Sequence, residues 1–547
     1  MADRKKASEL FIACLQNEGV RHIFGIPGEE NLDLMEAIAD SQLSFVTTRH
    51  EQGAAFMADV YGRLTGRAGV CLSTLGPGAT NLITAVADAN LDHAPLVAIA
   101  GQAGIHRLHK ESHQVLDLQD IFLPITKYSS RLLTPDTVPE VVRKAFKLAQ
   151  GDKPGACFIE FPENIAPLEV EAAPLPQERT IQPEPARAAL SRAAELIEQA
   201  QHPLILVGNG VIRAEACAEL ASFAGHLQIP LANTFMAKGV LPFRHSMALG
   251  TVGLQTHDYI NCGFQRADVI ICVGYDLVEY HPQLWHPTGD REIIHIDVTP
   301  AEVDASYGVS VEVVGDIQLS LERLTGMIKP HQGHCMYALR EALIAEMNEH
   351  AEDTDFPVKP QKVIWDLRTA MSLDDIVVCD VGAHKMWMAR MFRCEVPNTC
   401  IISNGFASMG IAVPGAIAAK LAEPSRAVVA VTGDGGFLMN SQEIETAIRL
   451  GLALVILVWN DGGYGLIEWK QMTTHGRASN VRFGNPDLVK YAESFGARGY
   501  RVERTDQLLP ILREALAANT VCIIDCPVDY SENMKLTAKL GEMVCMI

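Results

Sequence analysis

The sequence predicts an α/β protein of three doubly wound domains, each built on a parallel β-sheet. Short apolar runs rich in β-branched residues, such as residues 427–432 and 454–459, alternate with stretches of helical periodicity. Glycines follow many of these runs, as expected where parallel strands lead into the helices that cover them. The chain has 547 residues. Because one hydrophobic core stops growing at about 250–300 residues, about three domains are expected.

Changes in pattern along the chain predict the domain boundaries. A stretch rich in proline and glutamate, residues 162–185, is typical of a linker. We therefore expect an N-terminal, a central and a C-terminal domain over residues 1–165, 186–345 and 358–547.

The amino-acid composition limits the kinds of partner molecule that are expected. The formal net charge is −21, which disfavours nucleic acid or an anionic membrane as a partner. We find no apolar run long enough to span a bilayer and no secretory leader. The thirteen cysteines form no CxxC pair, so neither a zinc site nor a disulfide framework is indicated. We expect a cytoplasmic protein with no membrane partner.

Two aspartates follow neighbouring strands of the C-terminal domain. Asp434 lies in Gly433-Asp434-Gly435-Gly436 after one strand, and Asp461 follows the next. The carboxyl ends of parallel strands meet at one edge of a sheet, where ligands bind. Carboxylates combined with phosphate oxygens suit Mg²⁺. For a Gly-Asp-Gly alone, a tight turn with a solvated aspartate is the alternative. We expect a loop after Gly433 and then a helix capped by Ser441.

Glu51 lies between a predicted strand and a predicted helix, within residues 49–59 (RHEQGAAFMAD). Such a glutamate can simply stabilise the start of the helix. Two further segments have distinctive sequences, residues 76–81 (GPGATN) and 403–410 (SNGFASMG).

Together with the paired aspartates, these segments resemble the acetolactate synthase branch of the thiamin-diphosphate-dependent enzymes. The similarity runs in order from about residue 7 to residue 530. It implies three domains of the thiamin-diphosphate enzyme type, thiamin diphosphate and Mg²⁺ as cofactors, and active sites formed between subunits. A homodimer or homotetramer is therefore expected.

The resemblance also implies roles for individual residues. Glu51 would hydrogen-bond the pyrimidine ring and promote removal of the thiazolium C2 proton, and Met409 would wedge between the two rings. Asp434 and Asp461 would bind Mg²⁺ through their side chains, and Gly463 through its carbonyl. The remaining cofactor-binding residues implied by the match are Pro27, Pro77, Asn81, Gly382, Ala383, His384, Ser408, Gly433, Gly435, Gly436, Tyr464, Gly465 and Leu466.

Substrate-facing residues are less clearly marked. Gln114 matches a family glutamine that faces the substrate, although an exposed amide with no role is the alternative. Trp469 stands one position before the family tryptophan that selects 2-ketobutyrate. It would either shape the acceptor pocket or pack on its own helix.

One segment indicates which subgroup of acetolactate synthases the chain resembles. Residues 274–280 resemble the catabolic, flavin-free synthases, which implies that FAD and a regulatory subunit are not required. The central domain also contains Gly208-Asn209-Gly210, but Arg213 stands where the third glycine of a dinucleotide fingerprint belongs, so this motif is weak.

The resemblance implies condensation of two pyruvates to 2-acetolactate and CO₂, with 2-ketobutyrate as a further candidate acceptor. The alternatives of the same fold are a 2-oxo-acid decarboxylase and a flavin-dependent pyruvate oxidase. A non-catalytic binding or regulatory homologue is the alternative from another class. Such homologues typically lack the glutamate or the metal aspartates, and Glu51, Asp434 and Asp461 are all present.

Overall fold

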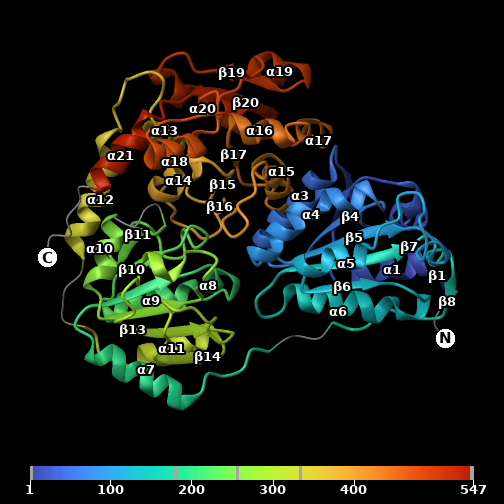
Figure 1. The fold of residues 1–547 in the computed structure, drawn as a ribbon, viewed down its shortest axis with the longest axis horizontal. Coiled ribbons are helices and arrows are strands. Elements are labelled where there is room, and N and C mark those ends of the chain that lie inside the picture. The colour runs from blue at the N-terminus through green and yellow to red at the C-terminus, as the bar shows by residue number, and fades with distance from the viewer. Residues whose placement is uncertain (1–3, 178–180, 254–257, 332–335, 542–547) are drawn as a thin grey trace. The chain divides into compact units, whose positions relative to one another are not determined.

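The computed structural model describes residues 4–177, 181–253, 258–331 and 336–541. Three six-stranded parallel sheets, each accompanied by helices, make up the fold (Figure 1). This confirms the predicted fold class. By internal contacts the chain divides into two compact units, of which the first holds one sheet and the second holds two.

The first unit is built around the sheet with strand order β3-β2-β4-β5-β7-β6. Strands β4, β5 and β7 are buried along their whole length, which explains their continuous apolar sequence. The strands are β2 (His22–Gly25), β3 (Ser44–Thr47), β4 (Gly69–Ser73), β5 (Leu96–Gln102), β6 (Tyr128–Arg131) and β7 (Ala156–Pro162). The main helices are α1 (Ala7–Asn17), α2 (Leu32–Ala39), α3 (Glu51–Thr65), α4 (Pro77–Leu91) and α6 (Val138–Gln150).

Two segments from late in the sequence complete this first unit, residues 405–425 and 437–454. The former contains α15 (Ala412–Ala422), which packs against α3, and the latter contains α17 (Glu443–Arg449). The expected linker over residues 162–185 contains a short strand, β8 (Glu169–Val170), which pairs with β1 (Lys5–Lys6).

The second unit contains the two other sheets, with orders β11-β10-β9-β12-β13-β14 and β16-β15-β17-β18-β20-β19. The strands of the first are β9 (Pro203–Val207), β10 (Leu231–Asn233), β11 (Ala248–Thr251), β12 (Val269–Val273), β13 (Glu292–Asp297) and β14 (Val311–Val314). Those of the second are β15 (Ile376–Cys379), β16 (Cys400–Ile402), β17 (Val428–Gly433), β18 (Leu454–Asn460), β19 (Arg498–Arg501) and β20 (Val521–Pro527).

The second unit also contains helices. They are α7 (Arg187–Gln199), α8 (Gly210–Arg213), α9 (Cys217–Leu227), α10 (Tyr259–Arg266), α11 (Ile317–Met327), α12 (Tyr337–Glu349), α13 (Pro360–Ala370), α14 (Ala383–Met391), α18 (Gly465–His475), α19 (Leu488–Ser494), α20 (Leu508–Ala517) and α21 (Ser531–Gly541).

One local prediction was wrong. Helix α16 (Asp434–Asn440) begins directly at Asp434, where we expected a loop, and Gln442 rather than Ser441 precedes α17. The Asp434 carboxylate accepts a hydrogen bond of 2.9 Å from the Gly435 amide, so it stabilises the free end of its own helix.

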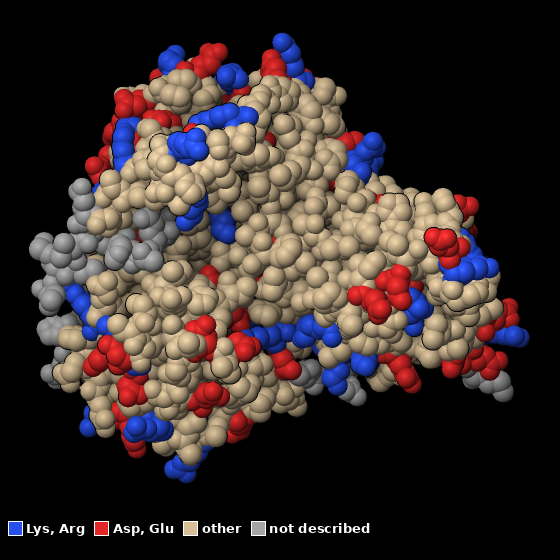
Figure 2. Space-filling view, viewed as in Figure 1, with Lys and Arg blue, Asp and Glu red and all other residues tan. Residues whose placement is uncertain are grey.

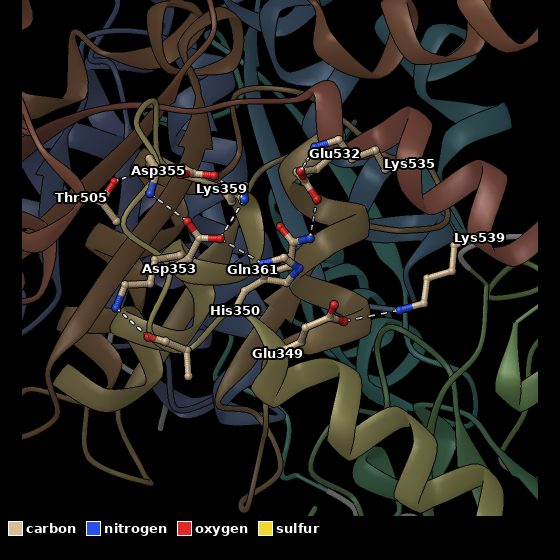
Figure 3. Close-up of polar contacts among 12 residues, drawn as sticks. Glu349, His350, Asp353, Asp355, Lys359, Gln361, Thr505, Glu532, Lys535 and Lys539 are labelled. Atoms are coloured by element: carbon tan, nitrogen blue, oxygen red, sulfur yellow. Dashed lines mark hydrogen bonds and ion pairs between the residues drawn. The ribbon is translucent and has the colours of Figure 1, made fainter.

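Polar contacts fasten helix α21 to α12 and α13 (Figure 3). The Gln361 side-chain amide donates to Glu532 at 3.0 Å, and the Lys539 ammonium lies 3.6 Å from Glu349. Lys359, beside them, donates to Asp353 and to Asp355, each at 2.8 Å.

Charged side chains of both signs are interspersed on the face shown in Figure 2. No helix within the described ranges is both long enough and apolar enough to cross a membrane.

Candidate active site

Glu51 opens helix α3, directly after the turn that follows strand β3. Its side chain is 9% exposed, and Oε2 accepts a hydrogen bond of 2.9 Å from the Asn81 amide. Asn81 lies in α4, where Gly78 also approaches the carboxylate: a Cβ built on Gly78 would lie 3.4 Å from Oε1 of Glu51. The structure thus brings Glu51 and Asn81 together, and a neutral amide orients the carboxylate.

The loops near the start of α4 hold the other predicted residues of the N-terminal domain. Pro27 and Pro77 are exposed, and Pro77 is the first residue of α4. Gln114 is exposed and has a φ of 58°. A Cβ on Gly76 would lie 2.9 Å from the Cβ of Gln114, so the glycine permits this close approach. Gln114 therefore lies close to Gly76, the residue directly before the helix that contains Asn81.

The loop that carries Ser408 and Met409 belongs to the same compact unit. Two backbone amides fix it to α4: that of Ser408 donates to Asp88 at 3.3 Å, and that of Gly405 donates to Asp92. Met409 is half-buried.

Asp88 and Asp92 belong to a buried cluster around Arg63, which the sequence did not indicate. The guanidinium pairs with Asp59 at 2.7 Å, with Asp88 at 3.1 Å and with Asp92. All four side chains are nearly inaccessible to solvent, and burial raises the pKa of Asp59 and of Asp88. The cluster joins α3, which begins with Glu51, to α4 and to the Met409 loop.

In the second unit, Asp434 and Asp461 follow the paired strands β17 and β18. Asp434 is 1% exposed, and its Oδ2 accepts hydrogen bonds from the Gly462 amide at 2.8 Å and the Asn485 side chain at 2.7 Å. The bond to Gly462 ties the two loops together beside Asp461. The predicted proximity of the two aspartate-bearing loops is thus observed.

Of the two carboxylates, that of Asp461 is the less well satisfied by its surroundings. Its Oδ2 is buried and makes no hydrogen bond, although Nη1 of Arg482 lies 3.6 Å away. Burial, together with the negative charge of Asp434, raises the pKa of Asp461 to about 7. Burial also raises the pKa of Asp434, against the hydrogen bonds from Asn485 and Gly462. A cation between these carboxylates would remove both penalties.

Asn485 is a site residue that the sequence analysis missed. Besides Asp434, it donates to the Asn460 side chain at 3.1 Å, while its own Oδ1 is buried without a hydrogen-bond partner. It lies in a loop before α19, with no local motif to mark it.

A second loop of the same sheet edge carries Gly382, Ala383 and His384. It follows β15, the strand paired with β17, and leads into α14. His384 is buried, and its Nε2 has no hydrogen-bond partner. Burial lowers the pKa of His384 to about 3, so the ring is neutral. A Cβ on Gly433 would lie 3.3 Å from this ring, which places the histidine against the Gly-Asp-Gly-Gly segment.

The residues after Asp461 close this side of the site. A Cβ on Gly435 would lie 2.9 Å from the Tyr464 ring, so the ring packs directly over the glycine-rich segment. Tyr464 is 39% exposed and packs edge-on against Phe483, with ring centroids 5.0 Å apart. Leu466 is half-buried against the core.

Trp469 points inward. It is 7% exposed, and its indole N–H donates to Thr537 at 2.8 Å. Trp469 therefore packs against α21, which contains Thr537, rather than only on its own helix α18.

The second-unit residues fit a divalent cation with a diphosphate. Among the described residues no group of three or more His, Cys, Asp or Glu gathers as a metal site. A cation here would therefore be held by two carboxylates, a backbone carbonyl and oxygens of the ligand, which is typical of Mg²⁺. The unpartnered Asp461 Oδ2 and His384 Nε2 are the groups that such a ligand would satisfy.

Three family models match the chain. Residues 5–121 match the N-terminal TPP binding domain of thiamine pyrophosphate enzymes, residues 190–324 the central domain, and residues 380–526 the C-terminal TPP binding domain.

Relatives match over nearly the full chain. An acetolactate synthase of Bacillus subtilis is 38% identical, over 99% of this chain and 97% of the relative. A catabolic acetolactate synthase of Raoultella terrigena is 34% identical, over 97% of both. An acetolactate synthase large subunit of Corynebacterium glutamicum is also 34% identical, over 94% of this chain and 86% of the relative.

Proposed function

Because this chain belongs to the acetolactate synthase family of thiamin-diphosphate-dependent enzymes, we propose that it condenses two molecules of pyruvate to 2-acetolactate and CO₂. The observation that carries the proposal is the presence of both sets of residues that the family uses. A buried glutamate, oriented by the Asn81 amide, is the first residue of α3, and an aspartate directly follows each of the paired strands β17 and β18. 2-Ketobutyrate is a second candidate acceptor.

Thiamin diphosphate supplies a nucleophilic carbon and an electron sink. In our proposal Glu51 is the group that holds and moves a proton at the aminopyrimidine. Its burial removes competing water, and Asn81 fixes the direction of Oε2. Met409, on a loop anchored to α4, provides the apolar side chain that shapes the cofactor.

We assign the metal site to Mg²⁺, with Asp434 and Asp461 as side-chain ligands and Gly463 as a carbonyl ligand. The raised pKa of Asp461 and its unpartnered oxygen support this assignment, since a divalent cation stabilises both charged carboxylates. Asn485 positions Asp434 by donating to it at 2.7 Å.

The diphosphate would contact two loops at this sheet edge. Gly382 and Ala383, at the start of α14, and Gly433 and Gly436, around Asp434, offer backbone amides. Gly435 instead lets the Tyr464 ring approach the segment closely. His384 contributes Nε2, which lacks a partner in the protein. Tyr464, Gly465 and Leu466 would lie beside the thiazolium, and Gln114 is our candidate for contact with pyruvate.

We place the enzyme in the flavin-free, catabolic branch. In the central sheet the amide of Asn209, in the glycine loop after β9, donates to Glu279 at 3.0 and 3.2 Å. A Cβ on Gly208 would lie 2.9 Å from the same carboxylate. Thr234 also donates to it. An internal carboxylate therefore takes the position that a cofactor phosphate occupies in dinucleotide folds, which supports the expectation that FAD is not required.

We also propose a homodimer or homotetramer that works without a regulatory subunit, since family sites form between subunits. Light scattering on the purified chain tests the assembly. A monomer that is fully active would contradict it.

The function itself is tested by incubating the purified chain with pyruvate, thiamin diphosphate and Mg²⁺, and assaying acetoin after acidification. Wild-type protein should form acetolactate at a rate that Glu51→Gln lowers by about 100- to 10,000-fold. Acetaldehyde as the sole product would instead indicate a decarboxylase. Absence of any pyruvate consumption would indicate a non-catalytic homologue.

A further inference from the structure

The turn that presents Glu51 is held by a carboxylate from far along the chain. Oε1 of Glu443 accepts hydrogen bonds from the backbone amides of Arg49 and His50, each at 3.0 Å. The Arg49 amide also lies 3.3 Å from Oε2. These two residues directly precede Glu51. We infer that Glu443 is a positioning residue that sets where Glu51 lies; the inference rests on the role proposed above for Glu51.

Glu443 is well suited to hold backbone in place. Its side chain is fully buried, and Oε2 also accepts a hydrogen bond of 2.7 Å from the Thr446 hydroxyl. The partners of the carboxylate are two amides and a hydroxyl. A buried amide without an acceptor destabilises the fold, so these bonds favour the observed turn. Water cannot replace these hydrogen bonds, because the Glu443 carboxylate is enclosed by protein.

Gly53 supplies independent support from the facing helix. A Cβ on Gly53 would lie 2.8 Å from Oε1 of Glu443 and 3.0 Å from its Cδ. Glycine inside a helix is less stable than alanine, and the φ of Gly53 is not in the left-handed region. The need to admit the Glu443 carboxylate gives a physical reason for a glycine at this position.

The segment around Glu443 also contacts residues on both sides of Glu51. Asn440 donates to the Gln52 side chain at 3.1 Å, and Arg449 donates to the carbonyl of Thr47. Asn440 donates in addition to the carbonyl of Gly410 at 3.0 Å, next to Met409. Residues 440–449 therefore connect the Glu51 turn with the loop of the proposed wedge, and Glu443 is their central, buried contact.

This arrangement predicts a specific defect. If Glu443 only stabilised the fold, its loss would lower thermal stability and leave the chemistry of folded enzyme unchanged. If it positions Glu51, its loss slows proton transfer in enzyme that is folded and loaded. A misplacement of about 1 Å in a catalytic group costs about 100-fold in rate.

The test uses three variants. Glu443→Ala removes the carboxylate, Gly53→Ala keeps the carboxylate but displaces it, and Glu443→Gln replaces it with an amide of the same shape. Glutamine retains one oxygen for the amides of Arg49 and His50, and its NH₂ can donate to the Thr446 hydroxyl. Glu445→Gln is the matched control, since Glu445 lies on the same helix in a partly exposed pair with Arg449. The readouts are cofactor affinity by calorimetry with Mg²⁺, kcat and KM for pyruvate, and the rate of deuterium exchange at the C2 position of the bound cofactor.

We expect Glu443→Ala and Gly53→Ala to slow C2 exchange and kcat by about 100-fold, with cofactor affinity and KM within about threefold of wild type. Glu443→Gln should recover most of the exchange rate, and Glu445→Gln should be normal. If Glu443→Ala fails to fold, the same comparison is made with Gly53→Ala and Glu443→Gln.

Exchange at the wild-type rate in folded, loaded Glu443→Ala or Gly53→Ala would overturn the inference. Glu51→Gln separates the two claims. If it slows exchange while the Glu443 and Gly53 variants do not, only the positioning role fails. If Glu51→Gln itself exchanges normally, the proposed role of Glu51 fails, and the positioning role fails with it.

Discussion

Replacement of Glu51 by glutamine is the most informative single substitution, because the structure separates its effect on folding from its effect on chemistry. The glutamine oxygen can still accept the 2.9 Å hydrogen bond from Asn81. The side chain is 9% exposed and has nearly the same volume, so packing around α3 is retained. We expect a change in the free energy of unfolding of less than about 1 kcal/mol.

The amide cannot take or return a proton, so the chemical step bears the loss. General acid–base groups contribute about 100- to 10,000-fold, and we expect kcat to fall by that factor with little change in cofactor affinity. The assay is steady-state acetolactate formation at saturating cofactor, alongside calorimetric titration of thiamin diphosphate. Activity within about threefold of wild type, with cofactor bound, would refute the assigned role of Glu51.

Three further predictions concern charged side chains and the groups that they pair with. Asp434→Ala should abolish Mg²⁺-dependent retention of thiamin diphosphate, measured by calorimetry; unchanged affinity would contradict the metal site. Arg63→Met should cost about 3–5 kcal/mol in urea unfolding, since it leaves buried aspartates unpaired; a loss below about 1 kcal/mol would show that the cluster is unimportant for stability. Burial opposes ionisation of Asp353, but hydrogen bonds from Lys359, the Asp355 amide and His350 together outweigh it and lower its pKa to about 2. The carboxylate should therefore stabilise the fold above about pH 4 and lose this effect as pH falls through about 2. Asp353→Asn should cost about 1 kcal/mol at pH 7 and only about a fifth of that at pH 2; an equal cost at both values would refute the pairing.

Local patterns predicted the parts of the site that depend on short stretches of chain. The strand before Asp434 and the strand before Asp461 are apolar and β-branched, and a helical pattern lies between them, so their burial and parallel arrangement were predictable from the local pattern. Glu51 likewise lies where a strand-to-helix transition places it.

Contacts between distant segments were not predictable from such patterns. Asn485 meets Asp434 from 51 positions away, and Glu443 meets Arg49 from 394 positions away. Neither residue lies in a local motif. Asn485 donates to a carboxylate of another segment, and Glu443 accepts from backbone amides of another segment. The start of α16 at Asp434 was missed because glycines normally disfavour a helix. Here the Asp434 carboxylate stabilises the helix end, and the glycines admit the side chains of Tyr464 and Asp380.

The most direct test of the account is product identification by carbon NMR, with isotopically labelled pyruvate, thiamin diphosphate and Mg²⁺ and with no added flavin. We predict 2-acetolactate and CO₂ as the products of a colourless protein, with formation stopped by removal of Mg²⁺. Activity only after addition of FAD would contradict the flavin-free assignment and the reading of Glu279 as the occupant of the central glycine loop. Acetaldehyde without acetolactate would contradict the condensation itself.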